Sequence, residues 1–264
     1  MAAATTPTTT VQSADGTTIA IDRVGNGPAL VLVPGAFQDR STTGGLAKFL
    51  GDDFAVFTYD RRGRGASGDT PPYSVEREIE DLDAVVGETG SSPFLFGHSS
   101  GAFLVLESAA RGMSLSKVVA YEPPYIVDAE DRPDRLAERV GSLVASGQPG
   151  EAMKLFFTEG PQLPPEAIAA MEQSPWWSAN EAIVNTLLYD LAIVGDQVVP
   201  SGRLANIRVP TLVLSGRESA AWARKSVKAV AGAIPGAQRD SLKGQTHGVS
   251  DDAIAPVLRR FFLT

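Results

Sequence analysis

Short apolar runs alternate with longer amphipathic segments over most of the chain. Four runs read as strands, namely Ala29–Val33, Pro93–Phe96, Val118–Tyr121 and Thr211–Leu214. Helical patterns follow at 102–111 and 251–262, and Val11–Val24 reads as an opening hairpin around Asp15-Gly16. Strands buried on both faces of a parallel sheet are continuously apolar, and their alternation with helices is typical of an α/β domain. The pattern predicts a mostly parallel, twisted sheet flanked by helices, formed by residues 11–123 and 209–264 after a flexible tail at 1–10.

The segment from Pro124 to Arg208 has a different pattern, without any strand signal. Four helical patterns occur in it, at about Arg132–Ser146, Glu151–Phe157, Pro165–Gln173 and Asn180–Val194. Short segments that contain glycine or proline separate them, namely Gly147–Gly150, Gly160-Pro161 and Ser174-Pro175. We therefore expect residues 124–208 to form a helical cap that is inserted into the sheet domain and lies over its catalytic end.

Candidate chemistry begins at the pentapeptide Gly97-His98-Ser99-Ser100-Gly101, between the run at Pro93–Phe96 and the helical pattern at 102–111. A G-x-S-x-G sequence between a strand and a helix is typical of a nucleophile elbow, a strained turn that exposes the serine hydroxyl. A serine needs a neighbouring base, and the chain has two histidines. His98 lies within the turn itself and is expected to pack or to hydrogen-bond. His247, in a polar loop before the last helix, is therefore the predicted base, and Ser99 the predicted nucleophile.

These features resemble the α/β-hydrolase-fold serine hydrolases, and the resemblance covers almost the whole chain. Ala29-Leu30-Val31-Leu32-Val33-Pro34-Gly35 is similar to the strand that leads to that family's oxyanion loop, and Tyr59–Gly65 (YDRRGRG) matches its Y-D-x-R-G-x-G stretch. The resemblance implies the α/β-hydrolase fold and an oxyanion hole formed by the backbone N–H groups of Ser100 and Ala36, with Phe37 as the alternative to Ala36. One departure is that Pro34-Gly35 replaces the family's usual His-Gly.

In this family the acid of the triad comes between the nucleophile and the histidine, at the end of a strand. Two carboxylates fit. Glu122 ends the run Val118–Tyr121 before Pro123-Pro124, and Glu218 follows the run Thr211–Leu214 and Gly216. Relatives with the acid at the second place usually have Asp three residues after that glycine, where this chain has Ser219. An isolated carboxylate on an apolar strand needs a partner, which protonated His247 would supply. We favour Glu122 and keep Glu218 as the alternative.

The acid after the sixth strand, V-L-V-P before the oxyanion loop, the Ser-Ser-Gly elbow and the Pro-x-Trp stretch at Pro175-Trp176-Trp177 are similar to the zearalenone-type lactonases. The resemblance implies hydrolysis of a small-molecule carboxylic ester or lactone, without a cofactor. The same triad also serves C–C bond hydrolases and thioesterases, and the fold hosts non-hydrolytic catalysts and binding proteins.

Large aromatic residues in the cap and on core loops are candidates for contact with the substrate. Two adjacent tryptophans in an extended segment face opposite sides, so one of Trp176 and Trp177 should line the cleft. The Pro-x-Trp match favours Trp177. The full set of predicted substrate-binding residues is Phe37, Tyr125, Trp177, Tyr189 and Trp222.

Composition narrows the classes of function. The net charge of −8 over 264 residues disfavours nucleic acid and anionic membranes as partners. The absence of cysteine excludes disulfides and thiolate metal sites, and two histidines offer no plausible metal cluster. The first ten residues lack the pattern of a signal peptide, so we expect a cytoplasmic protein. The oligomeric state is not encoded in these patterns.

Overall fold

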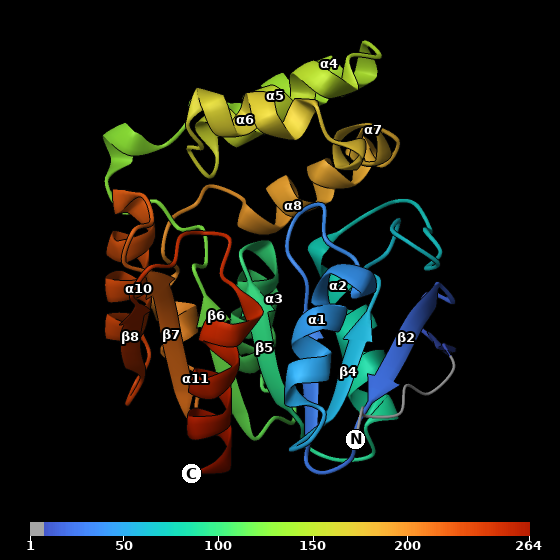
Figure 1. The fold of residues 1–264 in the computed structure, drawn as a ribbon, viewed down its shortest axis with the longest axis vertical. Coiled ribbons are helices and arrows are strands. Elements are labelled where there is room, and N and C mark those ends of the chain that lie inside the picture. The colour runs from blue at the N-terminus through green and yellow to red at the C-terminus, as the bar shows by residue number, and fades with distance from the viewer. Residues whose placement is uncertain (1–7) are drawn as a thin grey trace.

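The computed structural model describes residues 8–264, and its centre is one eight-stranded sheet (Figure 1). The strands are β1 (Thr9–Gln12), β2 (Thr18–Val24), β3 (Ala29–Val33), β4 (Ala55–Tyr59), β5 (Phe94–His98), β6 (Lys117–Tyr121), β7 (Thr211–Gly216) and β8 (Gln238–Leu242). Their order in the sheet is β1-β2-β4-β3-β5-β6-β7-β8. The pairs β1/β2 and β2/β4 are antiparallel and all the others are parallel. The predicted fold class is confirmed.

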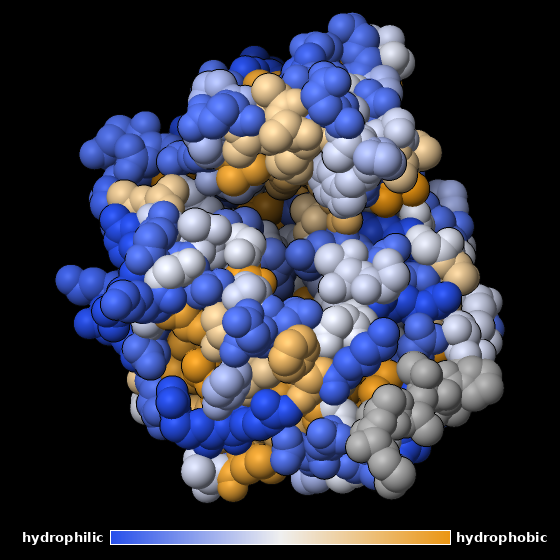
Figure 2. All heavy atoms as spheres, viewed as in Figure 1, coloured by the Kyte–Doolittle hydropathy of each residue, from blue (hydrophilic) through white to orange (hydrophobic). Residues whose placement is uncertain are grey.

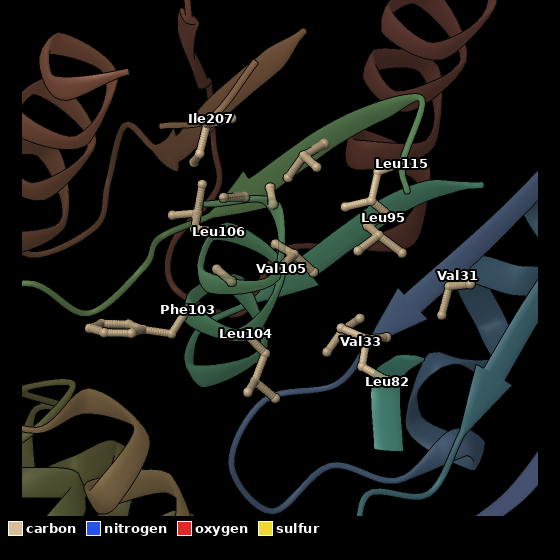
Figure 3. Close-up of a cluster of buried hydrophobic side chains, with 14 of the residues drawn as sticks. Val31, Val33, Leu82, Leu95, Phe103, Leu104, Val105, Leu106, Leu115 and Ile207 are labelled. Carbon is tan, nitrogen blue, oxygen red and sulfur yellow. The ribbon is translucent and has the colours of Figure 1, made fainter. Parts of the chain in front are cut away.

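Helices cover both faces of this sheet. The core helices are α1 (Arg40–Leu50), α2 (Val75–Glu88), α3 (Ser100–Ala110), α10 (Ala221–Ala233) and α11 (Asp251–Leu263). Successive strand residues face opposite sides, so Val31 and Val33 pack with α2, α3 and α10, while Leu30 and Leu32 pack with α1 and α11. Figure 3 shows the first of these clusters, centred on α3 and β5. Burial on both faces explains the continuous apolar runs in the sequence.

Between β6 and β7 the chain forms only helices. They are η1 (Ala129–Asp131), α4 (Leu136–Ala145), α5 (Pro149–Glu159), α6 (Pro165–Glu172), α7 (Pro175–Glu181), η2 (Val184–Thr186), α8 (Leu187–Val194) and α9 (Ser201–Leu204). Figure 1 shows α4, α5, α6 and α7 as a layer above the sheet, with α8 beneath them next to the core. We refer to residues 124–208 as the cap.

Two local expectations need correction. Ser174-Pro175 separates two helices as expected, but the second one begins at once and not at Asn180, because Ser174 is the N-cap of α7 and Pro175 is its first residue, where proline loses no hydrogen bond. The tail predicted for residues 1–10 falls outside the described residues as far as residue 7, and Thr9 and Thr10 already belong to β1. Within residues 8–264, no helix combines the length and the apolar character that crossing a membrane requires.

Candidate active site

Ser99 occupies a sharp turn between β5 and α3. Its backbone has φ 54° and ψ −121°, a strained conformation for a residue with a side chain. The flanking glycines are required by space. A Cβ at Gly97 would lie 2.3 Å from the carbonyl oxygen of Gly101, and a Cβ at Gly101 would lie 2.3 Å from that of Val33. The turn therefore has the geometry expected of a nucleophile elbow.

His247 and Glu122 lie in line with the Ser99 hydroxyl. The Nε2 atom of His247 is 3.1 Å from Ser99 Oγ, and its Nδ1 atom is 2.7 Å from Glu122 Oε2. A carboxylate only accepts hydrogen bonds, so Nδ1 carries a hydrogen in the neutral ring and Nε2 presents its lone pair to the serine. This arrangement can remove the proton from Ser99 Oγ.

Glu122 follows directly after β6 and is fully buried, with 0% exposure. Its Oε1 atom accepts hydrogen bonds from the Gly216 N–H at 2.7 Å and from the Ser219 hydroxyl. Burial alone would raise the pKa of Glu122, but these bonds and the one from His247 outweigh it and lower the pKa. Glu218 is exposed. Ser219 occupies the sequence position at which the relatives discussed above carry the acid. In this chain its hydroxyl donates a hydrogen bond to the carboxylate of Glu122.

The residues predicted to supply the oxyanion donors line a cavity that Ser99 and His247 also line. Ala36 and Ser100 both line it, and Ser100 is the first residue of α3, where N–H groups have no partner within the helix. Among residues 8–264 neither N–H donates a hydrogen bond to another group. Both backbone polar groups of Gly35, the residue before Ala36, are hydrogen-bonded. The N–H of Gly35 donates to Gln38 Oε1 at 2.7 Å, and its carbonyl oxygen accepts from Arg64 at 2.7 Å.

His98 supports the histidine loop. Its Nε2 atom is 2.8 Å from the carbonyl oxygen of His247, and because a carbonyl only accepts, Nε2–H is the donor. Its Nδ1 atom lies 3.3 Å from Gln38 Oε1. Burial, with the neighbouring charge of His247, lowers the pKa of His98 to about 4, so its ring is neutral at pH 7. His98 is a hydrogen-bonding residue of the turn, as its place in the sequence indicated.

A second buried carboxylate, Asp190 on α8, touches the residue after the nucleophile. Its Oδ1 atom accepts from Ser100 Oγ at 2.6 Å and from Arg61 at 2.7 Å, and Oδ2 pairs with Arg64. Arg61 also pairs with Glu78 at 2.7 Å. Burial alone would raise the pKa of Asp190, but the two guanidinium charges and the Ser100 bond lower it. This network joins the cap to the oxyanion loop.

A cavity of about 380 Å³ lies between the cap and the core above Ser99. Figure 2 shows the molecule hollowed at this level, with apolar atoms visible in the recess. Of the predicted substrate-binding residues, Phe37 and Trp222 line the cavity. Trp176 also lines it, with its ring 5.8 Å from that of Phe37.

The other three aromatic residues do not line the cavity. Trp177 is only 6% exposed and packs inside the cap against Phe157, so Trp176, at 37% exposure, takes the position predicted for Trp177. The prediction assumed an extended segment, but both tryptophans lie in helix α7. The packing of α7 against the rest of the cap buries Trp177 and leaves Trp176 at the cavity. Tyr125 stacks on Phe103 within the core cluster, and Tyr189 stacks on Tyr73 and donates to Asp69.

Sequence reasoning also missed Asp190, although a signal exists. Asp190 is the only charged residue in the helix Leu187–Val194, and an isolated charge on so apolar a helix needs a buried partner. The arginines of the YDRRGRG stretch supply it. Within the described part of the chain, no group of three or more acidic or histidine side chains has the arrangement of a metal site.

Comparison with known proteins supplies the context for this geometry. A model of the alpha/beta hydrolase family matches residues 30–260. A crystal structure of an alpha/beta hydrolase from Sphaerobacter thermophilus is 48% identical, covers 96% of this chain and 100% of that chain, and has a TM-score of 0.92.

Two other similar proteins carry more specific names. An N-formylmaleamate deformylase from Pseudomonas putida is 34% identical over 141 residues, which are 50% of this chain and 52% of that protein. The match therefore spans about half the length of the deformylase. An enol-lactonase from Burkholderia xenovorans has a TM-score of 0.70 at 21% identity and covers 95% of this chain and 98% of that chain. At that identity the likeness shows the fold alone.

Proposed function

The chain belongs to the alpha/beta hydrolase family, and we propose that it is a serine hydrolase that cleaves a carboxylic ester or lactone through an acyl-enzyme. The observation that carries the proposal is the hydrogen-bonded line from Ser99 through His247 to Glu122, with separations of 3.1 and 2.7 Å. Ser99 is the proposed nucleophile, His247 the base and Glu122 the acid that orients His247.

In the first half of the reaction, Ser99 Oγ attacks the ester carbonyl while His247 Nε2 takes its proton. Glu122 keeps its negative charge and stabilises the imidazolium ion that forms. The carbonyl oxygen becomes an oxyanion, which accepts hydrogen bonds from the N–H groups of Ala36 and Ser100. His247 then gives its proton to the departing alkoxide, and the acyl group stays on Ser99.

In the second half, His247 takes a proton from water, which attacks the acyl-enzyme, and returns that proton to Ser99. A lactone differs from an open ester because its alcohol remains tethered to the acyl group. The cavity must then hold both ends of the opened ring until water attacks. Support for a lactone is the position of Glu122 after β6, which this chain shares with the zearalenone-type lactonases it resembles.

A second candidate is cleavage of a formyl C–N bond. It is favoured by the 34% identity with the N-formylmaleamate deformylase. The triad chemistry would be the same, with an amide nitrogen in place of the alcohol oxygen as leaving group, protonated by His247 as it departs. Thioester and C–C bond cleavage use this triad too, so the bond that is cut depends on the substrate that the cavity accepts.

A hydrolysis screen tests the proposal. Purified protein is offered aryl esters, macrolactones, thioesters and N-formyl amides, with Ser99→Ala as the control for background. We expect the esters and lactones to give the largest kcat/KM, and Ser99→Ala to remove it. Turnover of the amides alone would support the second candidate, and no turnover of any class would favour a binding or non-hydrolytic role.

A further inference from the structure

The half of the cavity above Ser99 that α5, α6 and α7 line has apolar side chains, whereas Asp190 and Gln197 line the cavity from elsewhere in the cap. Phe156 and Phe157 of α5, Met171 of α6 and Trp176 of α7 line it, and Leu163 lies in the loop between α5 and α6. Phe37 of the core joins this wall, with its ring 5.6 Å from that of Phe157 and 6.1 Å from that of Phe156. A substrate group entering this half gains energy by burying apolar surface.

The lining offers no positive charge to a substrate. None of the described residues that line the cavity is lysine or arginine. Arg61 and Arg64, the nearest guanidinium groups of the network, are buried behind Asp190 and are already paired with it. Asp190 also lines the cavity, and its negative charge is balanced by these two arginines. Gln38, Thr42 and Gln197 add polarity without charge.

The apolar wall and the lack of a cation in the lining limit the charge that a substrate can carry in this half of the cavity. An ionised carboxylate against these apolar side chains would lose its water and find no cation to pair with. We propose, on the basis of the serine hydrolase function proposed above, that the natural substrate is neutral and places an alkyl or aryl group against the wall of Phe37, Phe157 and Trp176. Substrates with a carboxylate on that group are excluded.

A matched pair of esters tests this inference. p-Nitrophenyl octanoate and the mono-p-nitrophenyl ester of suberic acid share the leaving group and the chain length, and differ in a terminal methyl or carboxylate. The neutral ester should have a kcat/KM roughly a hundredfold higher or more, because the carboxylate loses its hydration without a partner. The preference should persist at high salt, since screening weakens only long-range repulsion by the net charge. Equal rates, or a preference that vanishes at high salt, overturn the inference.

An arginine introduced into the lining of the cavity tests whether the preference for a neutral ester arises at this wall. Met171→Arg puts a cation into the cavity, whereas Ala170→Arg puts the same charge on the exposed neighbouring position of α6. Met171→Arg should improve the ratio of kcat/KM for the anionic ester to that for the neutral one by about tenfold or more, and Ala170→Arg should leave it unchanged. Leu163→Arg is the second variant if Met171→Arg does not fold. The same ratio in both arginine variants contradicts the placement of the acyl chain.

Ligand binding, measured without hydrolysis, tests this inference independently of the proposed function. Trp176 and Trp222 line the cavity, so their fluorescence reports ligands in the Ser99→Ala variant, which leaves esters uncleaved. Ethyl octanoate should bind at least about a hundredfold more tightly than monoethyl suberate. If this preference holds while the wild type cleaves no ester, the proposed function falls and the inference about the cavity stands. If esters are cleaved but both ligands bind equally, the inference alone is wrong.

Discussion

Two regions of this molecule each bring a buried carboxylate to the elbow at Ser99, and their partners differ. In the first, at the ends of β6 and β7, Glu122 meets His247 and Ser219. In the second, where α8 of the cap meets the YDRRGRG segment, Asp190 meets Arg61 and Arg64. Both carboxylates have a lowered pKa and are almost completely buried, at 0% and 2% exposure.

The difference lies in whether the partner can change its charge. A histidine gains and loses a proton near neutral pH, whereas arginine stays protonated. Glu122 is therefore suited to stabilise a charge that appears only during the reaction. The charge of Asp190 is matched at all times, so its effect is on position, since its network reaches Ser100 and, through Arg64, the carbonyl of Gly35. In the proposed reaction the carboxylate of Glu122 would stabilise the charged form of His247, whereas the carboxylate of Asp190 would hold Ser100 and the loop at Gly35 in position.

The largest effect is expected from the residue that lies between the two regions. Ser99→Ala removes the proposed nucleophile's oxygen and should lower kcat by about six orders of magnitude with an unchanged melting temperature. His247→Ala should be nearly as damaging, and the double variant little worse, because these residues act as a unit. Steady-state kinetics and a melting curve check this. Retention of more than a few per cent of kcat in Ser99→Ala would contradict a serine mechanism.

The first region is tested by Glu122→Gln. The amide keeps the shape of the side chain but cannot stabilise the imidazolium ion, so kcat should fall by roughly three to four orders of magnitude with little change in substrate binding. Glu218→Gln is the matched control on the exposed neighbouring loop and should be nearly silent. A large loss in Glu218→Gln with a small one in Glu122→Gln would move the acid to the loop after β7.

The second region is tested by Asp190→Asn. It leaves Arg61 and Arg64 buried with one negative partner fewer, and should cost about 3–5 kcal/mol of unfolding free energy, as measured by urea denaturation. Glu138→Gln, which breaks an exposed pair with Arg135, should leave the unfolding free energy almost unchanged, because water screens that pair. Full stability of Asp190→Asn with a kcat as low as that of Glu122→Gln would instead assign Asp190 to proton transfer.

His98 adds a pH dependence on the triad side. Its pKa is about 4 in the folded protein against ~6.5 in an unfolded chain, so the unfolded state binds more protons between these values. Stability from this residue should therefore fall by about 2–3 kcal/mol as the pH drops from about 6.5 to 4, and level off about one pH unit below the folded-state pKa. Melting temperatures of wild type and His98→Asn across this range measure it. Identical pH slopes for the two proteins would remove His98 from this role.

The smallest effect concerns the cap aromatics. Trp176→Ala should cost about 1–3 kcal/mol of transition-state binding for a bulky ester and little for an acetate ester. Trp177→Ala is the matched neighbour, and should lower stability by about 3–5 kcal/mol and affect both esters alike. Values of kcat/KM for the two esters, beside melting curves, separate the cases. The reverse pattern would return Trp177 to the cavity.

The sheet could be predicted from the sequence because parallel strands buried on both faces leave continuous apolar runs. Ser99 and His247 could be proposed because an elbow has a local sequence and the chain has only two histidines. Helix α7 was missed because Ser174-Pro175 reads equally as a break or as a helix start. The choice between Trp176 and Trp177 depends on how α7 is turned against the rest of the cap, and this orientation is set by contacts distant in the sequence. Asp190 required knowledge that α8 lies against the arginines.

Labelling with a serine-directed phosphonate tests most directly the claim that Glu122 and His247 activate Ser99. The rate of labelling and the labelled residue are measured by mass spectrometry in the wild type, Ser99→Ala, Glu122→Gln and Glu218→Gln. We predict a single adduct on Ser99, none in Ser99→Ala, labelling slower by about a hundredfold or more in Glu122→Gln, and the wild-type rate in Glu218→Gln. An adduct on another residue, or an unchanged rate in Glu122→Gln, would contradict the account.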